Sequence, residues 1–411
     1  MQTFHIPQVQ FLLYIPFLFQ CFYAILSYVN IDVYEKLRKH LDVMPVAFPE
    51  TSSGVEIDIL RRFFTETEAE IVLHMNMLPE TSDRIRRRFG KDRISQKDIE
   101  GILRSLVEKK VINSGTRQKR GKSVRVYGKL PFAVGLYEYQ VDRLTRGFEK
   151  EAHTYMDEAF MHSFASEHPR QMRTIPINET ILPERNVSSY DKIRDLIRSS
   201  DGPFVKQNCI CRQGRELLGE QCSQTDLKET CLALGNAAEG VLRENRGTLL
   251  SREECLEFLE QAETEGLVLQ AQNTRKPAFI CCCCSCCCAI LSRVKKLHNP
   301  GSILTAKFRA AIDPNLCIGC GTCIQRCPMD ALVIQKNGER AKKAVLHTER
   351  CIGCGLCVNS CPVKAINLCA LGNAKNPPLN AMAMYIKMFL GRFGPVKGIF
   401  LLIKAGLGFR V

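Results

Sequence analysis

The arrangement of apolar and polar residues separates an uncharged beginning from a series of amphipathic segments. The first 30 residues contain no Asp, Glu, Lys or Arg, and residues 9–29 are mostly Phe, Leu, Ile, Tyr and Val. This length is close to the ~20 residues that a helix needs to cross a bilayer. The segment has neither the basic n-region nor the small-residue cleavage site of a secretory signal. We expect residues 1–30 to be a membrane anchor, or else a mis-assigned start, with translation then beginning near Val29.

Helical periodicity begins after residue 31 and predicts three helices followed by a hairpin. Thr65 and Glu68 have the spacing of a capping box, which predicts a helix to about Leu78. Ser82 or the residue after it can begin a second helix, and Ser95 begins a third. Short extended segments at 111–113 and 124–127 flank a basic stretch, which predicts a β-hairpin with a long tip.

Three helices followed by a basic hairpin resemble the winged-helix families, such as the MarR-like regulators, and we assign this fold to residues 31–165. In those families the third helix enters the major groove and the hairpin lies along the DNA backbone. The resemblance implies groove-facing side chains at Gln96, Lys97, Glu100 and Arg104, and phosphate contacts from Arg117, Lys119, Arg120 and Lys122. Winged helices also act as protein-docking modules, and the acidic residues of the third helix favour that alternative.

The middle of the chain is expected to be helical. A long helix is predicted from about Tyr137, and the stretch 169–183, with scattered Arg and Pro, reads as a linker. We treat 166–300 as one Cys-rich helical region. Two helices are predicted inside it, over 227–242 and after the capping box of Ser251.

Ten cysteines of this region are candidate metal ligands. Residues 281–288 contain seven cysteines, and burial in an apolar core does not explain so dense a run. Adjacent cysteines point in different directions, so only part of the run can converge on one centre. The upstream candidates are Cys209, Cys211, Cys222 and Cys231, and the downstream candidates are Cys281, Cys283, Cys284, Cys286, Cys287 and Cys288. They suffice for one or two further iron–sulfur clusters. Zinc storage, a thiol relay for disulfide exchange and low-complexity drift are the alternatives, and Cys255 is expected to be an isolated thiol.

Two copies of C-x2-C-x2-C-x3-C-P follow, at 317–328 and 351–362. Three thiolates at this spacing can hold three corners of an iron–sulfur cube, whereas the fourth cysteine lies too far round the turn and reaches the other cube. Between the copies, apolar segments at 331–335 and 344–347 flank Asn337 and a glycine, which predicts a short hairpin.

These motifs resemble the two-cluster bacterial ferredoxins, and we assign residues 301–375 to such a domain. The resemblance implies two [4Fe–4S] clusters. One is held by Cys317, Cys320, Cys323 and Cys361, and the other by Cys351, Cys354, Cys357 and Cys327. A zinc site or a disulfide framework fits two tandem quartets with trailing prolines poorly.

The amino-acid composition indicates the cellular compartment and shows how charge is distributed along the chain. The chain has 411 residues, 22 cysteines and a net charge of +14, and no acidic residue follows Glu349. So many thiols indicate a reducing, cytoplasmic setting. Because oxygen would degrade exposed thiolates and clusters, we expect an anaerobic or microaerobic host. The basic cluster at 36–39 would keep the bulk of an anchored chain on the cytoplasmic side. Residues 376–411 form a basic amphipathic tail that could bind a membrane interface, a partner or the ferredoxin domain.

The expected architecture is therefore α+β and multi-domain. Its layout resembles multi-domain ferredoxin-type 4Fe–4S proteins of anaerobic bacteria and archaea. We expect an electron carrier, more an accessory redox subunit than a self-contained enzyme, that serves a partner oxidoreductase, because no nucleotide motif is present. A cluster-dependent winged-helix regulator, and an enzyme whose substrate binds an incompletely ligated cluster, are the alternatives.

Overall fold

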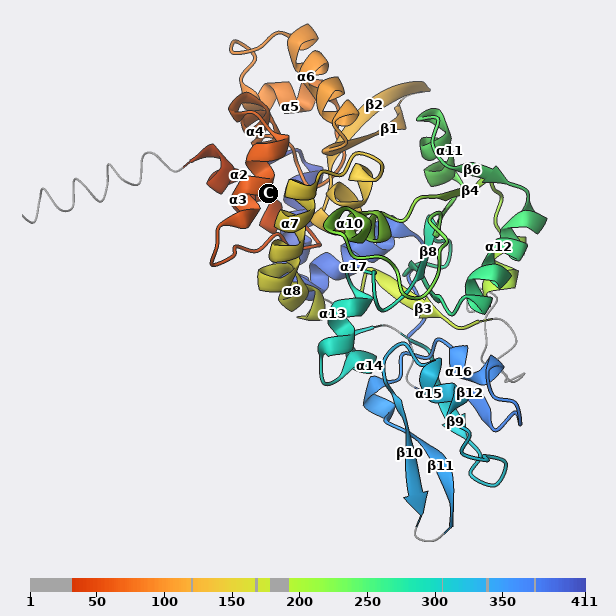
Figure 1. Ribbon diagram of the computed structural model, residues 1–411. Helices are drawn as coiled ribbons and strands as arrows, with labels where there is room; N and C mark the ends of the chain where they lie inside the picture. Colours follow the sequence, from red (N-terminus) through yellow and green to blue (C-terminus); the bar gives the residue numbers. More distant parts are fainter. Residues whose placement is uncertain are drawn as a thin grey trace, which may run out of the picture.

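The computed structural model describes residues 32–119, 121–166, 169–177, 192–304, 306–337, 340–372 and 375–411. Figure 1 shows a helical N-terminal part with a protruding hairpin, a central sheet flanked by helices, and a small strand-rich part at the opposite end. The predicted anchor, residues 1–30, lies outside the described residues. Within the described ranges, no helix combines the length and the apolar character that a membrane crossing requires.

The N-terminal part contains five helices and a hairpin among its described residues. They are α2 (Val33–Asp42), α3 (Val55–Phe63), α4 (Glu66–Leu73), α5 (Ser82–Phe89), α6 (Gln96–Glu108), β1 (Ile112–Lys119) and β2 (Lys122–Lys129). The capping box of Thr65 and Glu68 is confirmed, although α4 ends at Leu73 and not at Leu78. The Ser95 hydroxyl caps α6 as expected. Helix α5 begins one residue early, with Thr81 in the capping position.

The hairpin is longer than predicted, because the basic stretch expected at its tip pairs as strand. Lys119 is opposite Lys122, and Ile112 is opposite Lys129. The predicted helix from Tyr137 also begins later. Asp142 has a left-handed φ of 65°, and the Thr145 hydroxyl then caps α7 (Arg146–Tyr155) by accepting from the backbone N–H of Phe148. Between β2 and α7 lie η1 (Phe132–Leu136) and η2 (Glu138–Gln140), and α7 continues through η3 (Met156–Phe160) into α8 (Met161–Ser166).

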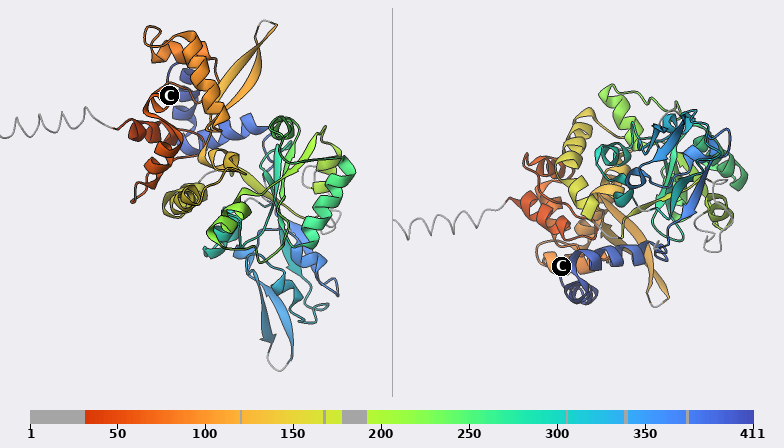
Figure 2. Two further views of the ribbon diagram at one scale, coloured as in Figure 1. Left: turned by 45° about the horizontal axis from the view of Figure 1, so that its top comes forward. Right: turned by 90° about the horizontal axis from the view of Figure 1, so that it is seen from below.

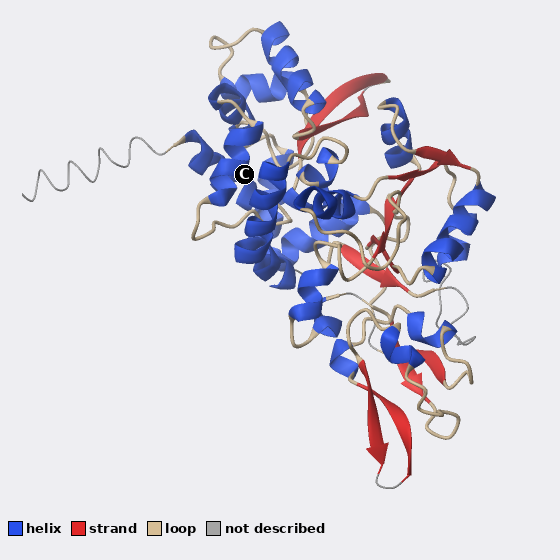
Figure 3. Ribbon diagram, in the orientation of Figure 1, coloured by secondary structure: helices blue, strands red, loops and turns tan. Residues whose placement is uncertain are grey.

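The central part is built on a six-stranded sheet, so the expectation of a helical region was wrong. The strand order is β3-β7-β8-β5-β4-β6, and every pairing is antiparallel. Figure 3 shows this sheet among its helices. Its elements are β3 (Met172–Ile175), α9 (Ile193–Arg198), β4 (Phe204–Gln207), α10 (Ile210–Leu218), β5 (Cys231–Leu234), α11 (Asn236–Arg243), β6 (Thr248–Leu250), α12 (Arg252–Thr264), β7 (Val268–Gln272) and β8 (Phe279–Cys283).

Two short helices lead from the sheet into the C-terminal part, which ends in a helical tail. The elements are α13 (Leu291–Lys296), α14 (Pro300–Ile303), β9 (Phe308–Ile312), α15 (Thr322–Gln325), β10 (Leu332–Asn337), β11 (Arg340–Leu346), η5 (Thr348–Arg350), α16 (Leu356–Asn359), β12 (Ile366–Ala370), α17 (Ala381–Phe393) and α18 (Pro395–Gly406). The predicted hairpin is confirmed as β10 and β11, and β12 pairs with β9.

Long-range hydrogen bonds join the parts. The Arg350 guanidinium donates to the carbonyls of Lys295 (2.8 Å) and Leu297 (3.1 Å), and the Ile177 N–H donates to the Cys354 carbonyl (3.1 Å). The Arg350 bonds join the C-terminal part to the end of α13, and the Ile177 bond joins it to the segment that follows β3. Figure 2 shows that the blue C-terminal helices leave this part and lie beside the N-terminal helices.

Candidate metal centres

The two cysteine motifs of the C-terminal part are loops pressed against neighbouring backbone. A Cβ on Gly319 would lie 2.0 Å from the carbonyl oxygen of Lys342, and one on Gly353 would lie 2.2 Å from that of Phe308. Both residues also have left-handed φ angles, 70° and 65°. Only glycine tolerates both conditions, so the C-x-G-C pattern shapes these loops.

Each motif contributes to two cavities. The larger cavity, about 350 Å³, is lined by Cys327 of the first motif and by three cysteines of the second, Cys351, Cys354 and Cys357. The other, about 320 Å³, is lined by Cys317, Cys320 and Cys323 of the first motif and by Cys361 of the second. The cavities therefore bring together the same two crossed quartets that the ferredoxin resemblance implies.

The donor chemistry at both cavities fits metal-bound thiolates. Backbone N–H groups point at three of the sulfurs: Ala331 at Cys327 (3.3 Å), Ala344 at Cys317 (3.4 Å) and Ala365 at Cys361 (3.2 Å). Such hydrogen bonds to sulfur stabilise negative charge and tune cluster potentials. Burial raises the pKa of the Cys357 thiol well above its usual range, so a cation is needed to hold it deprotonated.

The two cavities differ in their surroundings. The smaller one is lined by two exposed residues, Cys320 and Ile318 (59% exposed). The Thr322 hydroxyl lowers the pKa of the Cys320 thiol. The larger cavity belongs to the side that packs on the central part, where Ile352 and Leu356 are buried in the main core.

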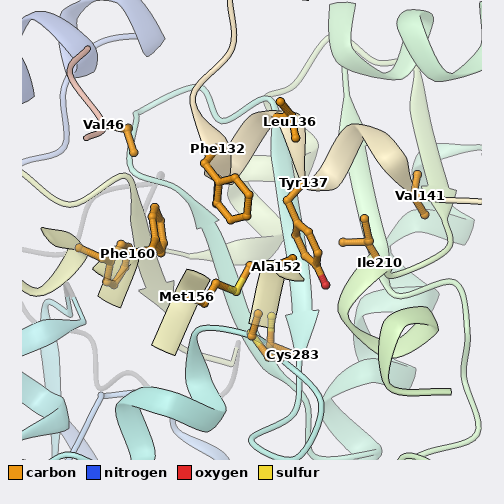
Figure 4. Close-up of a cluster of buried hydrophobic side chains, with 14 of the residues drawn as sticks. Val46, Phe132, Leu136, Tyr137, Val141, Ala152, Met156, Phe160, Ile210 and Cys283 are labelled. Atoms are coloured by element: carbon orange, nitrogen blue, oxygen red, sulfur yellow. The ribbon is translucent and has the colours of Figure 1, made fainter. Parts of the chain in front are cut away.

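Six cysteines of the central part form one connected group, which we call the six-cysteine group. On the sheet, Cys231 of β5 is directly opposite Cys281 of β8, and Cys283 shares the face of Cys281 because side chains alternate along a strand. Direct side-chain contacts, through which each thiol shifts the pKa of the next, connect the group in the order Cys209, Cys211, Cys288, Cys283, Cys281 and Cys231. Figure 4 shows Cys283 as a member of the buried cluster that also contains Phe132 and Tyr137.

The intervening residue of β8, Cys282, makes no such contact with the six-cysteine group. It is 1% exposed, and burial raises the pKa of its thiol well above the usual range, with smaller electrostatic contributions from Cys281, Cys209 and Cys255 of α12. Burial raises the pKa of the Cys255 thiol to about 12. Both are therefore neutral core residues, in agreement with the expectation for Cys255.

The other four candidate cysteines converge separately, in what we call the four-cysteine group. Cys222 lies 3.7 Å from Cys284 and 3.7 Å from Cys286, and Cys286 lies 3.7 Å from Cys287, measured between sulfurs. All four sulfurs lie within 4.8 Å of one another, and no other such group occurs among the described residues. The ten candidate cysteines thus divide into six and four.

Arg212 is the functional residue that sequence reasoning missed. It is 3% exposed, and its Nη2 lies 3.4 Å from the Cys284 sulfur while Nη1 donates to the Thr230 hydroxyl at 2.9 Å. Cys209, Cys222 and Cys284 all raise its pKa electrostatically, so this cation acts on both sulfur groups. Its position directly after Cys211 was the available signal, but adjacency in sequence does not reveal burial.

The described cysteines are all free thiols, which leaves them available as ligands and does not support a disulfide framework. Comparison with protein families matches the model of the 4Fe–4S dicluster domain to residues 310–368. Comparison with curated proteins finds no match. The matched stretch contains both crossed quartets and both hairpin strands. Residues 310–368 are therefore a ferredoxin-like iron–sulfur domain.

Proposed function

We propose that the protein is an iron–sulfur electron carrier that exchanges electrons with a partner oxidoreductase. The observation that carries this proposal is the pair of cavities, each lined by three cysteines of one motif and the last cysteine of the other. Cys317, Cys320, Cys323 and Cys361 would hold one [4Fe–4S] cluster, and Cys327, Cys351, Cys354 and Cys357 the other. When bound, such clusters supply one-electron transfer.

The exposed edge of the smaller cavity is the proposed contact with the redox partner. Ile318 is more than half exposed and lines the same cavity as the exposed Cys320, and an apolar side chain at an exposed cysteine offers a water-excluding surface. Transient redox complexes use such small surfaces.

We further propose that the six-cysteine group holds an additional iron–sulfur cluster. Its thiols are connected pair by pair, yet no three of them gather as closely as the four-cysteine group does. This wider spacing suits a centre in which each thiolate binds a different iron. The larger cavity lies on the side facing the central part, and the Ile177–Cys354 hydrogen bond joins the two directly.

The proposed experiment is anaerobic purification followed by iron and sulfide counts and electron paramagnetic resonance. Two clusters require about eight irons per chain, and a third requires about twelve. A preparation without iron in the C-terminal part would overturn the proposal. Eight irons would confine the clusters to residues 310–368 and remove the central one.

The regulator alternative receives no support from the contacts of α6. Of its predicted groove-facing residues, Gln96 donates to the Ser82 hydroxyl (2.9 Å) and to Glu100 (2.6 Å), so both side chains are engaged within the domain. Lys97 and Arg104 are exposed, as are most residues of the hairpin. Arg120 lies outside the described residues. The winged-helix assignment and DNA binding remain predictions, which a gel shift at defined salt tests.

We also propose that the tail binds an anionic lipid surface. Five apolar residues follow one face of α18 at helical spacing and are each at least half exposed: Val396, Ile399, Phe400, Ile403 and Leu407. Lys397 and Lys404 are exposed on the same helix, and no acidic residue occurs after Glu349. A basic helix with an exposed apolar face is typical of interfacial binding.

A further inference from the structure

The spacing of the four-cysteine group differs from that of a cluster site. A metal ion bound tetrahedrally by four thiolates at about 2.3 Å sets neighbouring sulfurs about 3.8 Å apart. The sulfur atoms of Cys222 and Cys284, of Cys222 and Cys286, and of Cys286 and Cys287 are each 3.7 Å apart. These three separations match edges of a tetrahedron around one ion, and the remaining three are no longer than 4.8 Å.

The cysteine quartets of the ferredoxin-like domain provide an internal comparison. A [4Fe–4S] core puts a separate iron behind each thiolate, so its ligand sulfurs lie farther apart than those around one ion. Neither quartet brings its sulfurs within 4.8 Å of one another, and each lines a cavity of more than 300 Å³. The same chain thus contains two sulfur arrangements with different spacing.

The charge around the group also favours a bound ion. Four thiolates and one divalent cation leave a net charge of −2, and burying such a charge is costly without a counter-charge. The buried guanidinium of Arg212 lies 3.4 Å from the Cys284 sulfur, and its Nε has no hydrogen-bond partner among the described residues. Cys284 and Cys287 are each 3% exposed, which closes the site to solvent on that side.

We propose that Cys222, Cys284, Cys286 and Cys287 bind one Zn²⁺ as a closed tetrathiolate site. A closed four-ligand set with no open position is typical of structural zinc. The ion would join the segment 219–230, which contains no helix or strand, to the turn that follows β8. The ion would thereby fix the position of Arg212 and of the two ends of the six-cysteine group, Cys209 and Cys231. It would not take part in electron transfer.

The test measures zinc and iron per chain in protein purified without chelators and without air. We expect about one zinc in the wild-type chain. The double variant C222S/C286S should lose this zinc and keep all its iron. C282A is the matched control, because Cys282 is also buried in the same cysteine run and lies outside both groups.

X-ray absorption at the zinc edge of the wild-type protein does not depend on how well a variant folds. We expect four sulfur ligands at about 2.3 Å. Loss of about four irons from C222S/C286S would overturn the proposal in favour of a cluster, and loss of one iron would overturn the choice of zinc. Absence of zinc from the wild-type protein would also overturn it. None of these outcomes depends on the iron of the ferredoxin-like domain, which the iron count tests separately.

Discussion

Cys361 belongs to the second motif by sequence and to the first motif's cavity by position. This one residue therefore tests the crossed arrangement. We predict that C361S and C317S each lose about four irons, and that the double variant C317S/C361S loses no more than either single variant, because both sulfurs serve one cluster. Iron counts and spin quantification measure the outcome.

The comparison variant pairs Cys361 with a cysteine of its own motif. C351S/C361S should lose about eight irons, because these sulfurs line different cavities. If C351S/C361S instead retains a cluster while C317S/C361S loses both, each motif holds its own cluster and the crossed assignment is wrong.

The lowered pKa of the buried Lys129 amine should make the stability of the protein depend on pH. Burial, together with the nearby cations Arg410 and Arg88, lowers its pKa to about 7, although Glu80 opposes this shift. The unfolded chain then binds more protons between about pH 7 and pH 10.5, so the free energy of unfolding rises with pH across that window by up to about 1.4 kcal/mol per unit. Below pH 7 the buried Lys129 amine is protonated in the folded protein, and the free energy of unfolding is lowered by the full cost of burying that charge.

We predict that K129M raises the melting temperature at pH 7 and removes most of this slope. Lys129 lies beside His40, whose Nε2 is 2.8 Å from both the Lys129 amine and the Met75 carbonyl, so the His40–Met75 contact can survive the substitution. Thermal unfolding at pH 7 and pH 9 measures the effect. An unchanged slope would mean that Lys129 is hydrated or paired in solution.

Residue-scale prediction from sequence succeeded where spacing carries the information. The capping roles of Thr65, Ser95 and Ser251 follow from residues three positions apart. The crossed cysteine ligands stay a prediction, and the two cavities group the cysteines in the way that the ferredoxin resemblance implies. Prediction from sequence failed for Arg212 and Lys129, because burial of a long basic side chain depends on which distant segments cover it.

At the scale of elements, β5 shows why the central region was mistaken for helix. The stretch 227–242 contains apolar residues at helical spacing, but Cys231–Leu234 pairs with both β4 and β8, and only Asn236–Arg243 is helical. Tertiary pairing overrides helix propensity in so short a segment. The helix after Ser251 was predicted correctly, because its capping box and Gly266, with a left-handed φ of 79°, mark both ends.

The contact between α7 and α10 yields a packing prediction. A Cβ on Gly214 would lie 2.0 Å from a carboxylate oxygen of Glu149, which is fully buried. The Tyr137 hydroxyl donates to this carboxylate at 3.0 and 3.1 Å, and His153 contacts it at 2.9 Å, so Glu149 cannot turn away freely. We predict that G214A destabilises the protein by about 1–3 kcal/mol.

Because α10 carries Cys211, G214A should also reduce iron in the central part and leave the ferredoxin-like domain loaded. Melting temperature and iron count report the two effects. G240A is the control. Gly240 lies on α11, and a Cβ there would have no neighbouring atom within 4 Å, so the substitution should leave the stability unchanged or raise it slightly. Equal behaviour of the two variants would contradict the packing argument.

If the apolar face of α18 binds lipid, vesicles should protect the backbone amides of this helix from hydrogen exchange. Amide hydrogen exchange of residues 395–406 should slow when vesicles rich in phosphatidylserine are added, and F400E/I403E should abolish the change, because charge on the apolar face prevents insertion. L249E is the control, since Leu249 is also more than half exposed but lies on β6. Equal protection by neutral vesicles would contradict the role of Lys397 and Lys404.

At the scale of the whole molecule, sequence predicted the order of the parts better than their contacts. The ferredoxin-like domain was assigned to residues 301–375, and the family model matches 310–368 inside that range, because the motifs are local. The return of the tail to the N-terminal helices was not predicted. Asn76 donates to the carbonyls of Ala405 (3.0 Å) and Phe409 (2.9 Å), and Arg88 donates to that of Gly408 (2.9 Å). Contacts between residues more than 300 positions apart leave no pattern in a single sequence.

We predict that N76A/R88A makes the tail sensitive to proteases and lowers the melting temperature. Each lost buried hydrogen bond costs about 1–3 kcal/mol when its partner stays unsatisfied. R87A is the matched control, because Arg87 lies on the same helix, is exposed and pairs only locally with Asp83. Cleavage of the tail at the same rate in both variants would show that the described bonds do not hold it.

The bonds from Asn76 and Arg88 to the last residues also have a consequence for synthesis. The first helices leave the ribosome long before Ala405 and Phe409 have been translated, so the amide of Asn76 must stay in water or find a temporary acceptor. Helices α2 to α6 therefore gain these contacts only after residue 409 has been made, and a chain that stopped before Ala405 would leave the Asn76 amide without these acceptors.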